Sequence, residues 1–180
     1  MTLEVIFAGF GGQGVMLMGQ IFAYAGMYED KNVTWFPAYG PEMRGGTANC
    51  SVVVSEAVVG SPVISEPDLL VVMNRPSLEK FESTVKPGGI LCYNSSLIEV
   101  KPKRTDLQIS AIPANEIATE LGNSRVGNMV MLGAIFQQTK VVKLETVLKV
   151  LEKTFAGKKQ NLIPVNQAAL EAGMKFVQKK

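Results

Sequence analysis

The chain has 180 residues, of which 47% are hydrophobic and 19% charged, and its formal net charge is +2. These values are typical of one compact domain, so we expect a single domain over residues 1–180. The sequence contains no histidine, which excludes Ser-His and Cys-His nucleophile systems, histidine general bases and histidine metal ligands. Its two cysteines, Cys50 and Cys92, are too few and too far apart for a disulfide framework, a zinc site or an iron–sulfur cluster.

The sequence predicts a cytoplasmic protein that does not enter a membrane. Its apolar stretches are interrupted well before the ~18–20 residues that a spanning helix needs, no signal-peptide pattern precedes the first apolar run, and two reduced thiols fit the cytoplasm. Residues 140–180 carry nine lysines and three acidic residues. A basic tail can attract phosphates, nucleic acid or an acidic protein. Because these lysines are dispersed, we interpret them as solvated faces of helices and expect no nucleic-acid partner.

The predicted elements alternate between strands and helices in the first part of the chain. A strand over residues 3–8 is followed by a largely apolar helix over 12–28, a strand over 32–36, a loop, and a strand over 47–55 with a short hairpin arm at 57–60. A strand at 68–73, a helix at 77–85, and strands at 90–93 and 107–112 come next. Only helices follow, at 114–121, 126–139, 144–155 and from Pro164 onward. This order predicts an α/β fold with a Rossmann-like, mostly parallel sheet flanked by helices and a helical C-terminal region.

The first loop carries a G-x-G-x-x-G pattern between a strand and a helix, formed by Gly9, Gly11 and Gly14, with Gly12 and Gln13 between them. Such glycines permit a tight turn and let a ligand approach the backbone, and the helix start offers unpaired N–H groups to an anion. Gln13 could add a side-chain amide. A dinucleotide site would also need an acidic residue after the second strand, where the sequence TWFP at 34–37 has none. Three interpretations stay open: a disfavoured dinucleotide site, glycines that only pack the helix on the sheet, and binding of a coenzyme phosphate or a partner's backbone.

A second shaped loop follows the second strand, where residues 39–46 read YGPEMRGG. Loops at the carboxyl ends of neighbouring parallel strands share one crevice, so we expect Glu42 and Arg44 to lie near the glycine loop. Arg44 between flexible neighbours suits bidentate binding of a carboxylate or phosphate. The alternative is a Glu42–Arg44 ion pair that only shapes the turn.

Together these two loops resemble the gamma subunit of 2-oxoacid:ferredoxin (acceptor) oxidoreductases. The resemblance is carried by the glycine loop, by YGPEMRGGTAN at 39–49, by Glu-Pro-Asp at 66–68 with Asn74 after the fourth strand, and by GNMVMLGA at 127–134. These stretches span nearly the whole chain in a compatible order. Members of the family oxidatively decarboxylate a 2-oxoacid to acyl-CoA and pass electrons to ferredoxin or a similar acceptor.

The resemblance implies a subunit that has no catalytic residue and no metal ligand of its own and is inactive in isolation. Thiamine diphosphate with Mg²⁺ and iron–sulfur clusters are expected on other chains: alpha and beta subunits and a ferredoxin-like delta subunit. This chain is expected to help form the approach of coenzyme A. The form of residues 39–49 looks more like 2-oxoglutarate or branched-chain members than pyruvate members, and we expect 2-oxoglutarate.

The residues that the resemblance implies for the edge facing coenzyme A and the partner subunits form one set. They are Gly9, Gly11, Gly12, Gln13, Gly14, Tyr39, Glu42, Arg44, Gly45, Gly46 and Asn74. A stand-alone Rossmann-type nucleotide-binding protein and a pure assembly subunit are the alternatives.

Overall fold

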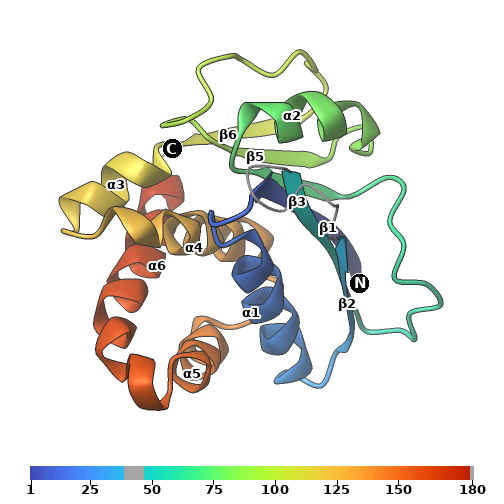
Figure 1. Ribbon diagram of the computed structural model, residues 1–180. Coiled ribbons are helices and arrows are strands. Elements are labelled where there is room, and N and C mark those ends of the chain that lie inside the picture. The colour runs from blue at the N-terminus through green and yellow to red at the C-terminus, as the bar shows by residue number, and fades with distance from the viewer. Residues whose placement is uncertain (39–46, 179–180) are drawn as a thin grey trace.

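A six-stranded sheet lies at the centre of the molecule (Figure 1), in a computed structural model that describes residues 1–38 and 47–178, apart from the side chain of Lys158. The strands are β1 (Thr2–Phe10), β2 (Asn32–Ala38), β3 (Thr47–Ser55), β4 (Leu69–Val72), β5 (Ile90–Asn94) and β6 (Gln108–Ile112). Across the sheet they are ordered β2-β3-β1-β4-β5-β6. The pairs β1–β4, β4–β5 and β5–β6 are parallel, whereas β3 runs antiparallel to both β1 and β2. The predicted α/β fold with a mostly parallel sheet is therefore confirmed, with β3 as the reversed strand.

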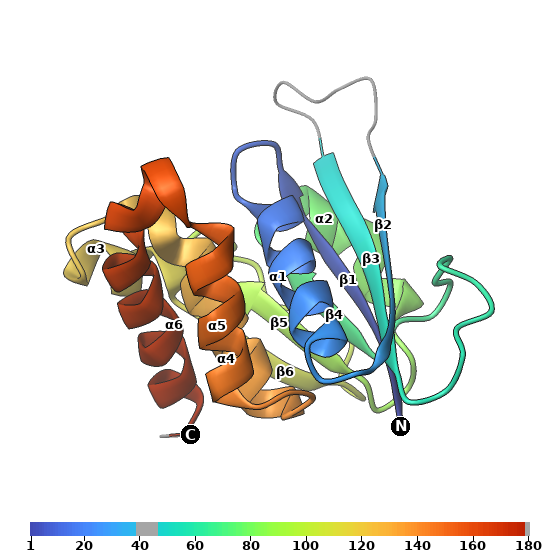
Figure 2. The ribbon, with the colours of Figure 1, turned by 90° about the horizontal axis from the view of Figure 1, so that it is seen from below.

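Helices cover both faces of this sheet (Figure 2). They are α1 (Val15–Met27), α2 (Arg75–Phe81), α3 (Ala114–Glu120), α4 (Gly127–Thr139), α5 (Leu144–Thr154) and α6 (Ile163–Gln178), with short 3-10 turns η1 (Glu82–Thr84), η2 (Ser124–Val126) and η3 (Gly157–Leu162). The helical C-terminal region is thus confirmed. No helix among the described residues has the length and apolar character needed to cross a membrane.

The larger core lies between the sheet and the pair α1 and α4. Phe22 of α1 makes an edge-to-face contact with Phe7 of β1, with ring centroids 5.6 Å apart, and stacks on Phe136 of α4 at 5.1 Å. The opposite face of the sheet is covered by Leu78 of α2 and by Ile98, both 2% exposed. Because both faces are covered, β4 is buried along its whole length and shows no alternation of polar and apolar residues.

Two glycines allow α4 and α6 to touch through their backbones. A Cβ atom at Gly133 would lie 1.9 Å from the carbonyl oxygen of Leu170, and one at Gly173 would lie 1.9 Å from that of Val130. No side chain fits at either position. This close crossing buries α4 on all sides, in agreement with its apolar sequence.

Two local predictions need correction. The hairpin arm expected at residues 57–60 is wrong, because the chain there contains no strand and the side chain of Val58 is 89% exposed, packed on nothing that would hold an arm. The helix expected over 77–85 begins earlier, at Arg75, and changes to a 3-10 turn at Glu82.

Candidate functional site

The glycine loop lies where the connections of the sheet diverge. From β1 the chain passes through α1, on the face of the larger core, and reaches β2 on one side of the sheet. From the adjacent strand β4 it passes through α2, on the opposite face, and reaches β5 on the other side. Ligands of open α/β sheets bind outside the carboxyl ends of the strands at such a switch point. The topology therefore places the first predicted motif where a ligand site is expected.

Gln13 closes the glycine loop. Its Oε1 accepts a hydrogen bond from the Phe10 N–H at 2.7 Å, and its Nε2 donates to the carbonyl oxygen of Met73 at 3.1 Å. A backbone bond from the Gln13 N–H to the Phe10 carbonyl, at 3.2 Å, completes the turn. The side-chain amide expected to contact a ligand thus uses both of its ends to hold the loop against the end of β4.

The glycines of the loop serve different purposes. Gly12 and Gly14 have positive φ angles of 95° and 74°, a region that side-chain-bearing residues rarely adopt. A Cβ at Gly14 would lie 2.2 Å from Nδ2 of Asn128, and one at Gly9 would lie 2.7 Å from Oε1 of Gln13. Around Gly12, by contrast, a Cβ would meet nothing within 4 Å, and Gly11 is exposed. Packing therefore explains Gly9 and Gly14, while the backbone at Gly11 and Gly12 is open to a ligand.

Asn74 caps α2. Its Oδ1 accepts a hydrogen bond from the Ser77 N–H at 2.8 Å, as the favoured cap residues do. The residue is 3% exposed, and its Nδ2 has no hydrogen-bond partner within the described part of the chain. The neighbouring Met73 N–H donates to the Ala8 carbonyl of β1 at 2.9 Å. Asn74 therefore directly follows Met73, whose carbonyl oxygen holds Gln13, and its own visible contact is structural.

Tyr39, Glu42, Arg44, Gly45 and Gly46 lie outside the described residues. The residues that flank this segment are described: Ala38 pairs with Asn49, and Thr47 pairs with Phe10 at the end of β1. The two flanking residues, Ala38 and Thr47, thus lie at the end of the sheet at which the glycine loop begins. In the same sheet, β3 lies between β1 and β2. In a dinucleotide-binding fold the second strand lies beside the first and carries the ribose-binding acid at its end. Here the end of β2 is not beside β1, which argues against a dinucleotide site.

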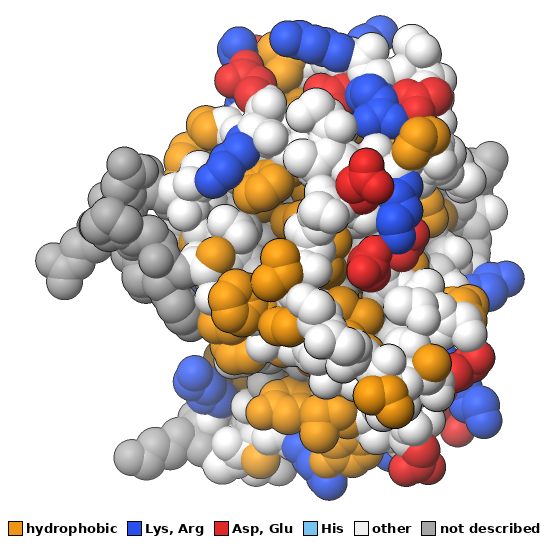
Figure 3. Space-filling model, turned by 90° about the vertical axis from the view of Figure 1, so that its right-hand side faces the viewer, with side chains coloured by type: hydrophobic (Ala, Val, Ile, Leu, Met, Phe, Trp, Pro, Cys, Tyr) orange, Lys and Arg blue, Asp and Glu red, His pale blue; other side chains and the backbone are white. Residues whose placement is uncertain are grey.

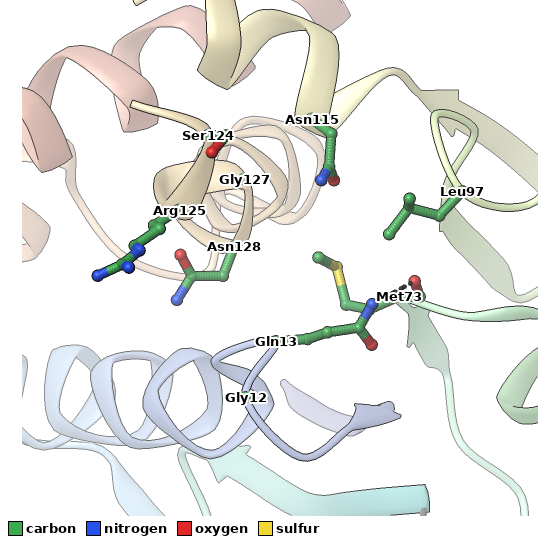
Figure 4. A pocket seen from close by; sticks show the side chains of 9 residues that line it. All are labelled: Gly12, Gln13, Met73, Leu97, Asn115, Ser124, Arg125, Gly127 and Asn128. Atoms are coloured by element: carbon green, nitrogen blue, oxygen red, sulfur yellow. Dashed lines mark hydrogen bonds between the residues drawn. The ribbon is translucent and has the colours of Figure 1, made fainter. Parts of the chain in front are cut away.

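A cavity of about 310 Å³ opens between the glycine loop and the start of α4 (Figure 4). It is lined by Gly12, Gln13, Met73, Leu97, Asn115, Ser124, Arg125, Gly127 and Asn128. Only Gly12 and Gln13 of these nine were predicted as site residues, because the approach of the other seven to the glycine loop depends on the tertiary fold. Their only signal in the sequence was that Gly127 and Asn128 begin one of the stretches that carry the resemblance.

The side chains that line this cavity are suited to binding a ligand and not to catalysing a reaction. Its described lining contains polar donors, one guanidinium and one hydroxyl, that of Ser124, but no Asp, Glu, Lys, Tyr or Cys, so no general base among these residues could activate Ser124 as a nucleophile. The two thiols lie elsewhere, and burial raises the pKa of Cys50 and of Cys92 to about 12. Within the described ranges, no group of three or more His, Cys, Asp or Glu residues is placed to hold a metal ion.

Comparison with known proteins identifies relatives of the chain. Residues 4–176 match the family described as pyruvate ferredoxin/flavodoxin oxidoreductase. The chain is 41% identical over 179 residues to the ketoisovalerate oxidoreductase subunit VorA of Methanothermobacter marburgensis. The matched region covers 98% of this chain but only 37% of VorA. It is 34% identical over 154 residues to the 2-oxoglutarate synthase subunit KorC of Methanocaldococcus jannaschii, covering 84% and 82% of the two chains. It is also 34% identical over 162 residues to the pyruvate/ketoisovalerate oxidoreductases common subunit gamma of Pyrococcus abyssi, covering 86% and 88%.

Solved structures extend the comparison. A keto/oxoacid ferredoxin oxidoreductase gamma subunit from Geobacter sulfurreducens superposes with a TM-score of 0.85 at 29% identity, over 99% of both chains. A 2-oxoglutarate:ferredoxin oxidoreductase from Magnetococcus marinus shares the fold with a TM-score of 0.91 at 24% identity, over 99% of this chain and 31% of that one. The same unit thus occurs as a separate chain and as about a third of longer chains. The chain belongs to the pyruvate ferredoxin/flavodoxin oxidoreductase family and corresponds in length and fold to its gamma subunits.

Proposed function

We propose that the chain is the gamma subunit of a heteromeric 2-oxoacid:ferredoxin (or similar acceptor) oxidoreductase. The whole enzyme converts a 2-oxoacid and coenzyme A to acyl-CoA and CO₂, and its electrons reduce the acceptor. The observation that carries the proposal is the combination of family membership with a switch-point cavity whose described lining has binding groups but no general base. Such a chain supplies part of a site whose chemistry is completed by other subunits.

Thiamine diphosphate with Mg²⁺ and the iron–sulfur clusters are assigned to the partner chains: alpha, beta and a ferredoxin-like delta subunit. A four-iron cluster takes four cysteine thiolates, whereas this sequence has two cysteines. Both are buried, and their raised pKa values of about 12 oppose the thiolate form that binds metal. The residues present therefore do not fit a cluster, and no redox step is assigned to this chain. We place the complex in the cytoplasm.

Exposed apolar side chains support the heteromeric assembly. They gather in several groups on the face of the molecule that lies on the right in Figure 1 (Figure 3). Independently of that view, Tyr24 and Met27 of α1, which are 49% and 55% exposed, line one pocket together, and Phe36 of β2 is 49% exposed. Clustered apolar surface of this kind is typical of subunit contacts.

The role proposed for this chain is to form one edge of the approach of coenzyme A. The open backbone at Gly11 and Gly12, beside the start of α1, provides N–H donors that suit a phosphate group. The Magnetococcus structure of the same fold contains coenzyme A and succinyl-CoA. Arg44 and its loop are proposed for the same edge on the basis of the sequence, while Gln13 and Asn74 position the loop and α2.

For the substrate we propose 2-oxoglutarate, with a branched-chain 2-oxoacid as the second candidate. The pattern of residues 39–49 supports both classes. The relative KorC is named for 2-oxoglutarate at 34% identity, and VorA for ketoisovalerate at 41%. The Pyrococcus gamma subunit is named as common to two oxidoreductases, which supports a gamma subunit that does not select the acid.

Affinity purification of the tagged chain from its native cells tests the proposal. We expect thiamine- and cluster-bearing chains to co-purify, and the complex to reduce ferredoxin or a viologen dye with coenzyme A and one of the two 2-oxoacids. Recovery of the chain alone, or a complex inactive with every 2-oxoacid, contradicts it. A stand-alone nucleotide-binding protein would instead show saturable NAD binding by calorimetry in the micromolar range.

A further inference from the structure

The outer edge of β2 has no neighbouring strand within the described part of the chain. β2 stands at the end of the strand order and pairs only with β3 there (Figure 2). Such an edge offers unpaired backbone groups to another strand, and proteins commonly protect it with charged side chains or proline. β2 contains no charged residue and one proline, Pro37. We propose that this edge and the flank of α1 beside it bind a second copy of this chain about a two-fold axis.

Pro37 indicates which backbone groups of β2 point outward. A proline is tolerated in an edge strand where its missing N–H would face away from the neighbouring strand. Because every second residue of a strand directs its N–H and C=O to the same side, those of Val33 and Trp35 also point outward. When two copies align with Thr34 opposite Thr34, Val33 of each copy faces Trp35 of the other, and the two strands exchange four backbone hydrogen bonds. The two-fold axis then passes beside Thr34.

The flank of α1 beside this edge is centred on the same axis. A Cβ at Gly19 would lie 3.1 Å from Nε1 of Trp35, and one at Gly26 would lie 2.9 Å from Cγ2 of Val33. α1 therefore runs antiparallel to β2, and the part of the helix between these two glycines is level with Thr34. A pocket of about 130 Å³ lies between the helix and the strand here, lined by Gln20, Ala23, Tyr24, Met27, Val33 and Trp35. One two-fold axis thus relates both the strand edge and the helix flank to their copies.

The composition of this surface fits a copy of itself. Neither α1 nor β2 contains a charged residue, so these elements bring no like charges together across the axis. Tyr24 and Met27 are 49% and 55% exposed, and interfaces are enriched in aromatic residues and methionine and depleted of charge. An axis perpendicular to the joined sheet keeps α1 of both copies on one face, where these side chains meet. A lone extended strand would cover the edge but bring no second helix against α1, whereas a second copy covers both.

Disulfide cross-linking of the full chain tests the position of the axis. In Thr34→Cys the two new thiols meet at the axis, where the Cα atoms of a non-hydrogen-bonded pair are about 4.5 Å apart, a distance that a disulfide can span. In Phe36→Cys, on the same strand and face, the two thiols are displaced by four residues, or roughly 13 Å. We expect Thr34→Cys to form a covalent dimer under mild oxidation and Phe36→Cys, the matched control, to form none. The native thiols do not interfere, because Cys50 and Cys92 are buried.

Sedimentation velocity of the full chain at micromolar concentration measures the association itself. We expect the native chain to be a dimer, and Met27→Lys and Phe36→Lys, which put charges on the helix flank and the strand edge, to be monomers. Leu121→Lys charges another exposed side chain, at the end of α3 and far from β2 in Figure 1, and should stay dimeric. All three residues are exposed, so the variants should fold. A monomeric native chain, a dimer that survives both Met27→Lys and Phe36→Lys, or equal cross-linking of Thr34→Cys and Phe36→Cys overturns the inference.

The inference goes beyond the proposed function and does not depend on it, because the dimer is measured without partner subunits. If the chain dimerises through β2 but its complex oxidises no 2-oxoacid, the interface stands and the proposed function is wrong. Hydrogen exchange gives the converse outcome, since the backbone amides of Val33 and Trp35 should exchange more slowly as the chain concentration rises. If these amides are protected only in an active complex that contains a single copy of the chain, a partner subunit covers the edge, the second copy is wrong and the proposed function stands.

Discussion

The contact between Gly14 and Asn128 makes the glycine loop depend on α4, and replacing Gly14 by alanine measures that dependence. The φ angle of 74° at Gly14 would cost an alanine about 1–2 kcal/mol. The new Cβ would also lie 2.2 Å from Nδ2 and 2.8 Å from Cγ of Asn128, an overpacking that costs about 1–3 kcal/mol. We therefore expect Gly14→Ala to lower the free energy of unfolding by about 2–5 kcal/mol.

Gly12→Ala is the matched control for this experiment. Its φ angle of 95° imposes a similar backbone cost, but its Cβ would meet nothing within 4 Å. Urea unfolding followed by the fluorescence of Trp35, the one tryptophan of the sequence, measures both variants. The double variant Gly14→Ala/Asn128→Ala removes the clash, so it should cost less than the sum of the two single changes. If Gly14→Ala is no more destabilised than Gly12→Ala, the contact with α4 does not hold the loop.

Three further results are expected. Gly133→Ala would place a Cβ 1.9 Å from the Leu170 carbonyl oxygen, so the backbones of α4 and α6 would have to move apart. Thermal denaturation should therefore show a loss of unfolding free energy larger than the ~1 kcal/mol that is typical of point substitutions. Gln13→Ala removes the hydrogen bonds to Phe10 and Met73 and should cost about 1–3 kcal/mol of unfolding free energy, measured in urea. Gln13→Glu keeps the acceptor for the Phe10 N–H but sets a carboxylate oxygen against the Met73 carbonyl oxygen, so it should not recover this loss; a Glu variant as stable as the native chain would contradict the assignment. Burial raises the pKa of Cys50 and of Cys92 to about 12. This stabilises the folded state fully below the ordinary thiol pKa of 9.0 and progressively less as the pH rises from there toward 12. Iodoacetamide at pH 8 should therefore label neither thiol until urea unfolds the chain.

Local sequence patterns predicted most of the elements but not the direction of β3. Apolar runs and glycine breaks indicate strands and helices because each pattern has its own period. A parallel pair needs a crossover of a dozen or more residues, and the eight residues from 39 to 46 are too short for one. The reversal of β3 could therefore have been predicted from the length of that connection. The prediction of a hairpin arm at 57–60 was wrong because the apolar residues there lie on an exposed segment that forms no strand.

The candidate site was predicted only where its residues are neighbours in sequence. The strand–glycine–helix context located the loop, and Asn74 could be recognised as a helix cap three residues before Ser77. The partner of the Gln13 amide is the Met73 carbonyl, 60 residues away, and Asn128 meets Gly14 across more than a hundred residues. Such contacts depend on which helix the fold places over the loop, and no local pattern indicates this.

The hydrogen bonds around the carboxyl ends of β1, β4 and β5 also determine the entropy of any binding event in the cavity. Gln13 is held by Phe10 and Met73, and Asn115 accepts a bond from the fully buried Asn94 at 2.7 Å. These groups are held by the fold itself, so a molecule that enters the cavity would find them already ordered. The exposed Arg125 is the long charged side chain of the described lining, and immobilising such a side chain costs about 0.5–1.5 kcal/mol.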